Sequence, residues 1–413
     1  MLKLLLIAPN CDGEDVGEAW VGYQWARGLA RRHDISVLTY YKRGKTPASQ
    51  QLAGLRVVEW AEPLGLGWAE RFNSMLKPGY VPFYLKARRW IRQALARGEH
   101  FDLAHQPVPV AMRYPSPVTG LGIPYVIGPV GGSLDSPPGF NKETDTAPWY
   151  VGLRSLDRLR MRRDPLLRKS YEGASCVIGI APYVSDFLKD RSIHHFEIMS
   201  ETGIEKLPEP VDRTTRGDQV RLLYVGRLVR TKGARDAIRA MSLLRDLQVL
   251  LDVVGDGFDR EACKTLASNL GVADRVVFHG WKSRNEIQDF YRIADIFVFP
   301  SYREPGGNVA FEAMGHGLPL IVSDRGGPGS AVDGTCGIRV CPVTPDQYAR
   351  DIAGAIRRLV ENRGLRLSLG NAARRRVADI ALWDRKFDHL DSLFEKVLEK
   401  PVVAFSNTGH RNN

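Results

Sequence analysis

Short, almost continuously apolar runs recur along the chain and alternate with stretches of helical periodicity. Clear examples are residues 3–9 (KLLLIAP), 220–226 (VRLLYVG) and 319–324 (PLIVSD). Strands of this composition are buried on both faces, which is typical of parallel sheets covered by helices on either side. The alternation of strand and helix therefore predicts an α/β architecture of doubly wound parallel sheets.

The chain has 413 residues, too many for one ordinary core, so two domains are expected. The polar stretch 205–219 (EKLPEPVDRTTRGDQ) has two prolines and no periodicity, which indicates a boundary. Ligands of such sheets bind at the carboxyl ends of strands, so the predicted site is the cleft between the two domains. We predict, in chain order, a Rossmann-like domain over 1–205, a linker over 206–219, a second Rossmann-like domain over 220–385, a helix over 386–400 that crosses back to the first domain, and a flexible tail over 401–413.

The net charge is +11, and the basic excess is spread over both halves of the chain. It favours anionic partners such as phosphates, nucleotides or an acidic membrane face, and neither half resembles a nucleic-acid-binding module. The five cysteines are scattered, without the spacing of a disulfide framework or a zinc site. The first apolar run ends at Pro9, too early for a signal peptide, and no run reaches the roughly 18 apolar residues of a membrane span. These features predict a cytoplasmic protein.

Two glutamates, Glu304 and Glu312, flank a glycine-containing turn between a predicted strand (296–301, IFVFPS) and a predicted helix. Asn308 is the predicted N-cap of that helix. A helix N-terminus with nearby glycine is a site for phosphate. From one turn into the helix, Glu312 reaches a vicinal diol such as a ribose, and Glu304 reaches a second polyol on the other side. A diphosphate between a ribose and a second sugar is a nucleotide sugar.

A second candidate element covers residues 221–238 (RLLYVGRLVRTKGARDAI), which read as a strand, Gly226, and a basic loop that opens a helix. Arg227 and Lys232 both follow the strand. We predict that they reach the cleft and neutralise the diphosphate as it leaves.

Four segments resemble, in this order, the carboxyl-terminal domain of the retaining glycosyltransferases of family 4. They are RLLYVGRLVRTKG, DVVGDGFDR, RVVFHGW and EPGGNVAFEAMGHGLPLIVSDRGGP. The Glu-x7-Glu motif is the most specific part, and the first half agrees more loosely, through EDVGEAW and the TGI of SETGIEKL. The resemblance implies the GT-B fold. It also implies transfer of a hexose-type sugar from a nucleotide sugar, UDP- or GDP-linked, to a glycan or lipid-linked acceptor in cell-surface polysaccharide synthesis.

The resemblance implies a role for each matching residue. Glu304 contacts hydroxyls of the donor sugar and Glu312 holds the ribose, while Arg227 and Lys232 grip the diphosphate. The remaining donor-binding positions are glycines and backbone groups that approach the phosphates or the base: Gly17, Gly226, Gly255, Trp281, Gly306, Gly307, Asn308 and Val309.

The sequence departs from the family in three places. Many members have Phe at the position of Gly306 and a hydrophobic residue at that of Asn308. Many also have a His after the strand that is here 124–129 (PYVIGP), where this chain has GPVGGS, residues 128–133, and no His. His105, at the end of a neighbouring predicted strand, is the candidate for that catalytic role. The alternative is a His that caps a strand end or packs under a loop.

The resemblance implies a front-face displacement, in which the diphosphate leaves and the acceptor hydroxyl attacks from the same side. The leaving phosphate can take the proton, so the protein acts by positioning and by stabilising charge. We see no Asp-x-Asp motif placed to hold a metal, so neither a metal nor another cofactor is expected.

Residues 71–97 carry seven basic residues, no acidic one, and many apolar side chains. We predict that this segment docks on an anionic membrane, at the inner face of the plasma membrane, where it meets a lipid-linked acceptor. The alternative is an amphipathic helix with a solvated basic face, in which Tyr84, Ala87, Ile91 and Leu95 face the core. For a second basic stretch, 154–169, the solvated reading is favoured.

Two other functions fit the same fold. One is a nucleotide-sugar epimerase or hydrolase, which would release a free sugar or an epimer without an acceptor. The other is a non-catalytic GT-B scaffold, against which the complete donor motif argues. A dehydrogenase is excluded, since no strand is followed by G-x-G-x-x-G and a suitably spaced acidic residue.

Overall fold

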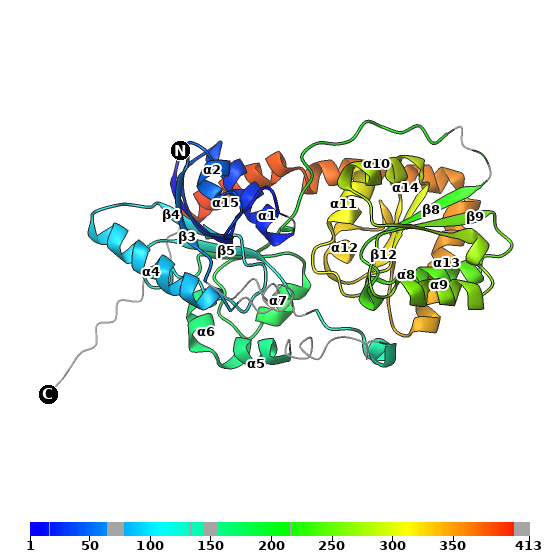
Figure 1. Cartoon of the computed structure of the whole chain (residues 1–413), viewed down its shortest axis with the longest axis horizontal. Coiled ribbons are helices and arrows are strands. Elements are labelled where there is room, and N and C mark those ends of the chain that lie inside the picture. The colour runs from blue at the N-terminus through cyan, green and yellow to red at the C-terminus, as the bar shows by residue number, and fades with distance from the viewer. Residues whose placement is uncertain are drawn as a thin grey trace.

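Two parallel sheets form two domains that lie side by side along the long axis of the molecule (Figure 1). The computed structural model describes residues 1–15, 17–63, 78–132, 134–143, 155–214, 217 and 219–399. The predicted tail, residues 401–413, and the start of the basic segment, residues 71–77, lie outside the described residues.

The first domain is built on a seven-stranded sheet with the order β3-β2-β1-β4-β5-β6-β7, in which every pair is parallel. Leu5 and Ile7 of the central strand β1 point to one face of the sheet, Leu4 and Leu6 to the other, and all four are buried. The strands are β1 (Lys3–Asn10), β2 (Asp34–Tyr41), β3 (Arg56–Ala61), β4 (Leu103–Gln106), β5 (Tyr125–Val130), β6 (Cys176–Gly179) and β7 (Phe196–Ile198). The helices are α1 (Glu18–Ala30), α2 (Ala48–Gln51), α4 (Tyr80–Ala96), η2 (Pro138–Glu143), α5 (Ser155–Arg163), α6 (Pro165–Glu172) and α7 (Tyr183–Leu188).

The second domain repeats this plan with a six-stranded parallel sheet of order β10-β9-β8-β11-β12-β13. The predicted α/β fold with two doubly wound parallel sheets is therefore confirmed. The strands are β8 (Val220–Val225), β9 (Val249–Val254), β10 (Val276–Gly280), β11 (Ile296–Phe299), β12 (Leu320–Ser323) and β13 (Gly337–Val340). The helices are η4 (Arg230–Lys232), α8 (Ala234–Ser242), α9 (Arg260–Asn269), η5 (Ala273–Arg275), α10 (Arg284–Ile293), α11 (Asn308–Gly315), α12 (Gly326–Ala331), α13 (Pro345–Glu361) and α14 (Arg363–Ile380).

The last helix, α15 (Trp383–Glu399), returns from the second domain to pack on the first (Figure 1). It begins three residues before the predicted start at 386. Phe387 is buried edge-to-face against Trp25 of α1, with ring centroids 5.6 Å apart. A Cβ atom at Gly28 of α1 would overlap the Phe387 ring, so a glycine is required where the two helices touch.

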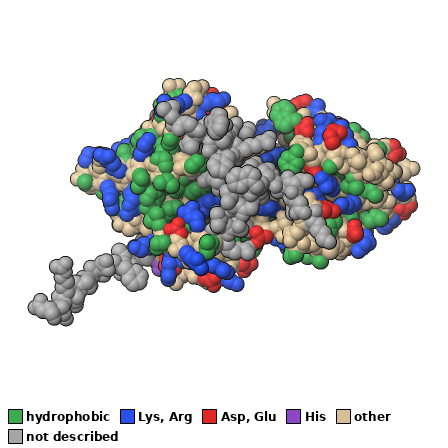
Figure 2. Space-filling view, turned by 60° about the horizontal axis from the view of Figure 1, so that its bottom comes forward, with side chains coloured by type: hydrophobic (Ala, Val, Ile, Leu, Met, Phe, Trp, Pro, Cys, Tyr) green, Lys and Arg blue, Asp and Glu red, His purple; other side chains and the backbone are tan. Residues whose placement is uncertain are grey.

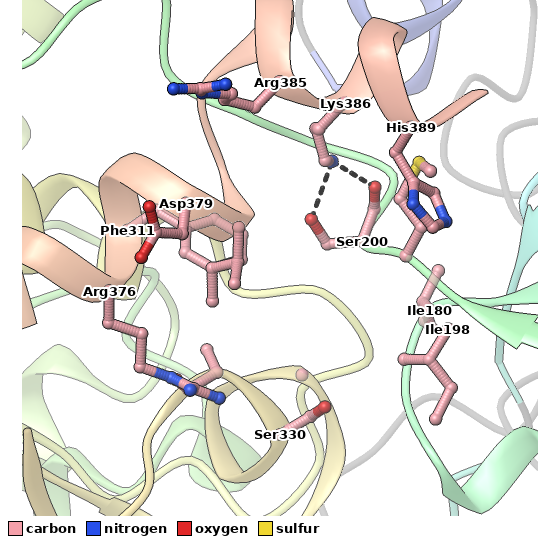
Figure 3. Close-up of a pocket in the computed structure, with 14 residues that line it drawn as sticks. Ile180, Ile198, Ser200, Phe311, Ser330, Arg376, Asp379, Arg385, Lys386 and His389 are labelled. Atoms are coloured by element: carbon pink, nitrogen blue, oxygen red, sulfur yellow. Dashed lines mark hydrogen bonds between the residues drawn. The ribbon is translucent and has the colours of Figure 1, made fainter. Parts of the chain in front are cut away.

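The chain crosses between the domains twice, and the two crossings are hydrogen-bonded to each other. The Ile204 amide donates to the Ala381 carbonyl at 2.9 Å, and the Trp383 amide donates to the Ile204 carbonyl at 3.1 Å. Lys386 of α15 is buried, and its Nζ donates to the Ser200 hydroxyl at 2.8 Å and to the carbonyls of Ser200 and Thr202. A cavity of about 310 Å³ lies at this crossing, and Figure 3 shows Lys386 pointing to Ser200 at its edge.

Replacing Phe387 with alanine should lower the free energy of unfolding by about 3 kcal/mol, because the ring fills a buried site between α1 and α15. Denaturant unfolding followed by circular dichroism measures this. The control is Asp388→Asn, which removes an exposed partner of Arg32 on the same helix and should cost less than about 1 kcal/mol. Equal effects of the two changes would contradict the packing role of α15.

Candidate functional site

The turn between β11 and α11 has the shape expected of a phosphate site, with one difference at the helix start. The N-cap is Gly307, with a φ of 92°, and Asn308 is the first helical residue, so the prediction of Asn308 as N-cap is wrong. Glycine is required at 307 because its φ is positive and because a Cβ there would lie 2.8 Å from Cγ of Pro328. Gly307 has no side chain that could cap α11, so the first amides of α11 lie at a helix N-terminus beside a backbone that a phosphate can approach closely.

Gly306, where many family members carry a phenylalanine, is buried against the connector between the domains. A Cβ atom at this position would overlap the carboxylate of Glu201, which lies in the connector that leads from the first domain to the second. Burial raises the pKa of the Glu201 carboxyl, and the Lys386 ammonium opposes this rise. The loss of a side chain at 306 is therefore explained by the acidic group that occupies its space.

Glu312 lies one turn into α11 and is held by two neutral donors. The Tyr291 hydroxyl donates to Oε2 at 3.0 Å, and the Asn308 amide donates to Oε1 at 2.8 Å. Burial raises the pKa of Glu312, while these hydrogen bonds and the Arg284 guanidinium act in the opposite direction. Because each carboxylate oxygen has further lone pairs, Glu312 can still accept hydrogen bonds from a ligand diol.

The Glu312 carboxylate lines a cavity of about 340 Å³ between the two domains. Trp20 of α1 forms its first-domain wall and stacks on the Arg284 guanidinium, whose carbon lies 4.5 Å from the ring centroid. Gly17, with a φ of 68°, is the N-cap of α1 and so begins the helix that carries Trp20 into this cavity. A cavity of this size is in the range of small-molecule sites.

Glu304 and Lys232 form an ion pair at the carboxyl ends of β11 and β8, with side chains 13% and 14% exposed. Lys232 is the last residue of η4, and Arg227 lies exposed in the same loop. Burial and the Arg227 guanidinium lower the pKa of Lys232, while the Glu304 carboxylate in contact with it favours the ammonium form. The structure thus brings Lys232 and Glu304, which are predicted to bind different parts of the donor, into direct contact.

Two of the predicted donor-binding glycines, Gly226 and Gly255, meet at the ends of the neighbouring strands β8 and β9, beside the end of β10. Gly255, with a φ of 135°, has no room for a side chain because a Cβ would overlap the carbonyl oxygen of Gly226. Its amide donates to the Gly280 carbonyl at 2.8 Å. The next residue, Trp281, is 74% exposed, so its backbone lies at this edge while its ring points outward. Val309 is half-buried on the first turn of α11 and accepts a long hydrogen bond from Tyr291.

The prediction that His105 is catalytic is wrong, because the residue is fully buried in the first domain. Its Nε2 donates to the Gly128 carbonyl at 2.7 Å, and its ring packs edge-to-face against Trp25 and Phe394. Burial lowers the pKa of His105 to about 4. The alternative interpretation, a His packed beneath other elements, describes this residue.

Sequence reasoning missed four residues that surround the two glutamates and their turn: Trp20, Glu201, Arg284 and Tyr291. Trp20 and Arg284 lie on different domains, so no local spacing relates them. The only available signals were an aromatic residue soon after Gly17 and an acidic residue directly before the TGI turn. Among the described residues, no group of three or more His, Cys, Asp or Glu side chains is arranged to hold a metal ion.

Two parallel-sheet domains that face each other across a cleft, with a carboxylate-flanked glycine turn at one side, define a glycosyltransferase of the GT-B class. Residues 208–376 match the family model of the glycosyl transferases group 1, and residues 17–195 match that of the glycosyl transferase 4-like domain. The chain belongs to the group 1 glycosyl transferases, which confirms the resemblance found from its motifs.

Relatives and solved structures agree with this assignment. The lipopolysaccharide core biosynthesis glycosyltransferase LpsE of Rhizobium meliloti is 30% identical over 252 residues, which cover 58% of this chain and 72% of that protein. An uncharacterized glycosyltransferase of Methanocaldococcus jannaschii is 36% identical over 169 residues, 40% of this chain, and the match spans only 42% of that protein's length. Anabaena HepE in complex with UDP-glucose shares the fold, with a TM-score of 0.61 at 17% identity over 96% of this chain and 100% of that chain.

The burial of His105 predicts a defined pH dependence of stability. In the unfolded chain a His binds its proton near pH 6.5, whereas folded His105 resists it until about pH 4. The unfolded state binds more protons in that window, so stability falls as the pH falls through it, by about 3 kcal/mol at most. His105→Gln keeps a donor for the Gly128 carbonyl but does not titrate.

Denaturant unfolding at a series of pH values from 7 to 4 measures the difference between wild type and His105→Gln. The wild-type protein should lose stability more steeply, and the variant should keep its activity at neutral pH. Parallel pH profiles, or an inactive but folded variant, would contradict the buried, non-catalytic assignment.

Proposed function

We propose that this protein transfers a hexose-type sugar from a nucleotide diphosphate sugar to a hydroxyl acceptor, with retention at the anomeric carbon. The observation that carries the proposal is the placement of Glu304, paired with Lys232, and Glu312 on either side of the Gly307 turn at the start of α11. Glu304 accepts hydrogen bonds from the sugar and Glu312 from the ribose, while the amides between them bind the diphosphate.

The positions of Lys232 and Arg227 indicate a role for each in binding the diphosphate. Lys232 pairs with Glu304, so an incoming diphosphate competes for the ammonium and frees the Glu304 carboxylate to accept sugar hydroxyls. Arg227, which is exposed beside it, adds a second positive charge. Together they stabilise the charge that develops on the leaving diphosphate, and the leaving oxygen accepts the acceptor's proton. We propose that this step needs no metal.

The donor class is supported by a structural neighbour, Anabaena HepE, whose structures are complexes with UDP and with UDP-glucose. The acceptor class is supported by LpsE, which is named for lipopolysaccharide core biosynthesis. We propose a cell-surface glycan or its lipid-linked precursor as the acceptor. An epimerase or hydrolase of the same fold, and a non-catalytic scaffold, are the alternatives that the donor assay separates.

The first domain also presents a surface suited to an anionic membrane. As the alternative predicted, Ala87 and Ile91 of α4 face the core, but the opposite side exposes Val81 by 65% and Leu85 by 61%. Exposed basic residues continue this side of the helix: Lys86, Arg89 and Arg92. Figure 2 shows basic and hydrophobic side chains side by side on the first domain. We propose that α4 docks at the headgroup level of a bilayer that carries the acceptor. Within the described residues, no helix is long and apolar enough to cross a bilayer.

A thermal-shift screen against UDP-glucose, UDP-galactose, UDP-N-acetylglucosamine and GDP-mannose tests the donor site. One donor at ten times its Kd should stabilise the wild-type protein by about 1.4 kcal/mol and should stabilise Glu312→Gln far less. The matched control is Glu261→Gln, which changes an exposed glutamate of α9 and should leave the shift unchanged.

Incubation of the protein with the selected donor, with and without excess chelator, then separates the alternatives. Acceptor-dependent release of nucleotide that survives chelation supports metal-independent transfer. Rapid release of free sugar or an epimer without acceptor favours the second enzyme class. Donor shifts that are equal in wild type and Glu312→Gln would overturn the assigned site.

Co-sedimentation with vesicles tests the membrane surface. The wild-type protein should bind vesicles that contain phosphatidylglycerol, and not pure phosphatidylcholine, at low salt. Arg89→Gln combined with Arg92→Gln should weaken this binding by roughly tenfold or more, since each basic residue contributes about 1 kcal/mol. The control, Lys264→Gln with Arg358→Gln, makes the same charge change on the second domain and should bind as wild type. No binding by wild type, or equal loss in both pairs, would rule out this docking surface.

A further inference from the structure

A segment of the first domain, residues 134–143, lies against the second domain (Figure 1, teal). We call it the strap. Its Phe140 is fully buried and belongs to the hydrophobic core of the second domain. The Phe140 ring contacts Tyr302 at a centroid distance of 4.4 Å and Tyr348 at 5.9 Å. A Cβ atom at Gly139 would overlap the Val343 carbonyl, so the strap's backbone is also in close contact.

The strap adds an ionic anchor next to its aromatic one. Glu143 pairs with Arg230 at 2.6 Å and with Arg239 at 2.7 Å, and both arginines belong to the second domain. Arg230 also pairs with the fully buried Asp236 at 2.6 Å. Two carboxylates thus balance two guanidinium groups in a largely buried cluster. Without Glu143 the cluster would hold one unbalanced positive charge.

The strap's partners are joined directly to the residues of the donor site. Arg230 is the first residue of η4, and Lys232 is the last. The Arg230 guanidinium packs next to both the Phe140 and the Tyr302 ring, at 5.3 and 5.4 Å from their centroids. Tyr302 stands two residues before Glu304 in the turn. Both halves of the Lys232–Glu304 ion pair are therefore carried by backbone that the strap holds.

The other end of the strap connects this anchor to the end of β5 in the first domain. Asp135 accepts a hydrogen bond at its carbonyl from the Arg325 guanidinium, at 2.7 Å. Leu134 packs beside Gly326, where α12 begins. These residues follow Gly132, which lies just beyond β5 and whose amide donates to the Tyr183 hydroxyl within the first domain. The strap thus runs from the end of β5 to the residues that hold the Lys232–Glu304 ion pair.

We propose that Phe140 and Glu143 are positioning residues. The strap fixes the distance between the two domains and aligns Lys232 with Glu304 from the side of the acceptor domain. The alignment rests on the function proposed above, whereas the mechanical coupling of the domains does not. A strap of this kind makes the geometry of the donor site depend on where the first domain sits.

The test compares Phe140→Ala and Glu143→Gln with wild type, with Glu143→Asp as the conservative variant. The control is Asp246→Asn, which breaks an exposed ion pair with Arg357 in the same domain, away from the strap. Small-angle scattering and calorimetry report the mechanical role. We expect a larger radius of gyration and two separated thermal transitions in both strap variants, and wild-type behaviour in the control and in Glu143→Asp. Unchanged scattering with one transition would overturn the coupling.

Kinetics with UDP-glucose, or whichever of the four screened donors binds, report the alignment. We expect turnover to fall roughly 10- to 100-fold in the strap variants while the donor Kd changes less than about threefold, because misalignment affects the reacting geometry more than binding. Equal losses in turnover and donor affinity would indicate a damaged second domain and overturn the positioning role. If wild type binds no donor and turns none over, the proposed function fails, while the scattering result still decides the coupling.

Discussion

The two crossings of the chain between the domains constrain everything else in this molecule. They pair through Ile204 with Ala381 and Trp383, and the buried ammonium of Lys386 is satisfied by oxygen atoms of Ser200 and Thr202. A buried cation is tolerated only where its protons are hydrogen-bonded, so this connector has one defined conformation. Glu201 lies in the same connector and touches Gly306, which places the junction of the domains in contact with the turn that carries Glu304.

That contact explains why the turn departs from its family. A phenylalanine at 306 would need the space that the Glu201 carboxylate occupies. The turn is therefore shaped from three sides: by the connector at Gly306, by Pro328 of α12 at Gly307, and by the strap behind Tyr302. Each of these supports comes from a different part of the chain, so the local conformation of the turn is a property of the assembled domains.

Much of the fold and part of the site could be predicted from the sequence. Local composition identifies the buried strands. Arg227, Lys232 and Glu304 lie in the loops that follow predicted strands, and Glu312 lies in the predicted helix after the turn. The sequence around His105 does not show whether solvent or a distant helix covers a His at a strand end. In the structure, Trp25 of α1 and Phe394 of α15 cover the His105 ring.

The other differences also have physical causes. Gly307 is the N-cap, and Asn308 is not, because the backbone at the N-cap has a positive φ. This requirement outweighs the capping preference of asparagine. The local sequence of the strap predicts only a Pro- and Gly-containing loop. Its partners stand about 90 to 210 positions further along the chain, beyond the reach of any periodicity.

The two glutamates of the turn differ in what a ligand must displace to reach them. Glu312 is bound by neutral donors that leave lone pairs open, so a diol adds to an existing arrangement. Glu304 is bound by the Lys232 ammonium, which a diphosphate would attract more strongly, so in the proposed function Glu304 becomes available when the donor's phosphates bind. For the nucleotide sugar that we propose as donor, binding of the ribose and phosphates therefore precedes engagement of the sugar. In this proposed order, the Lys232–Glu304 pair keeps the sugar site closed to molecules that lack a diphosphate, and the proposed positioning role of the strap is to keep the pair aligned.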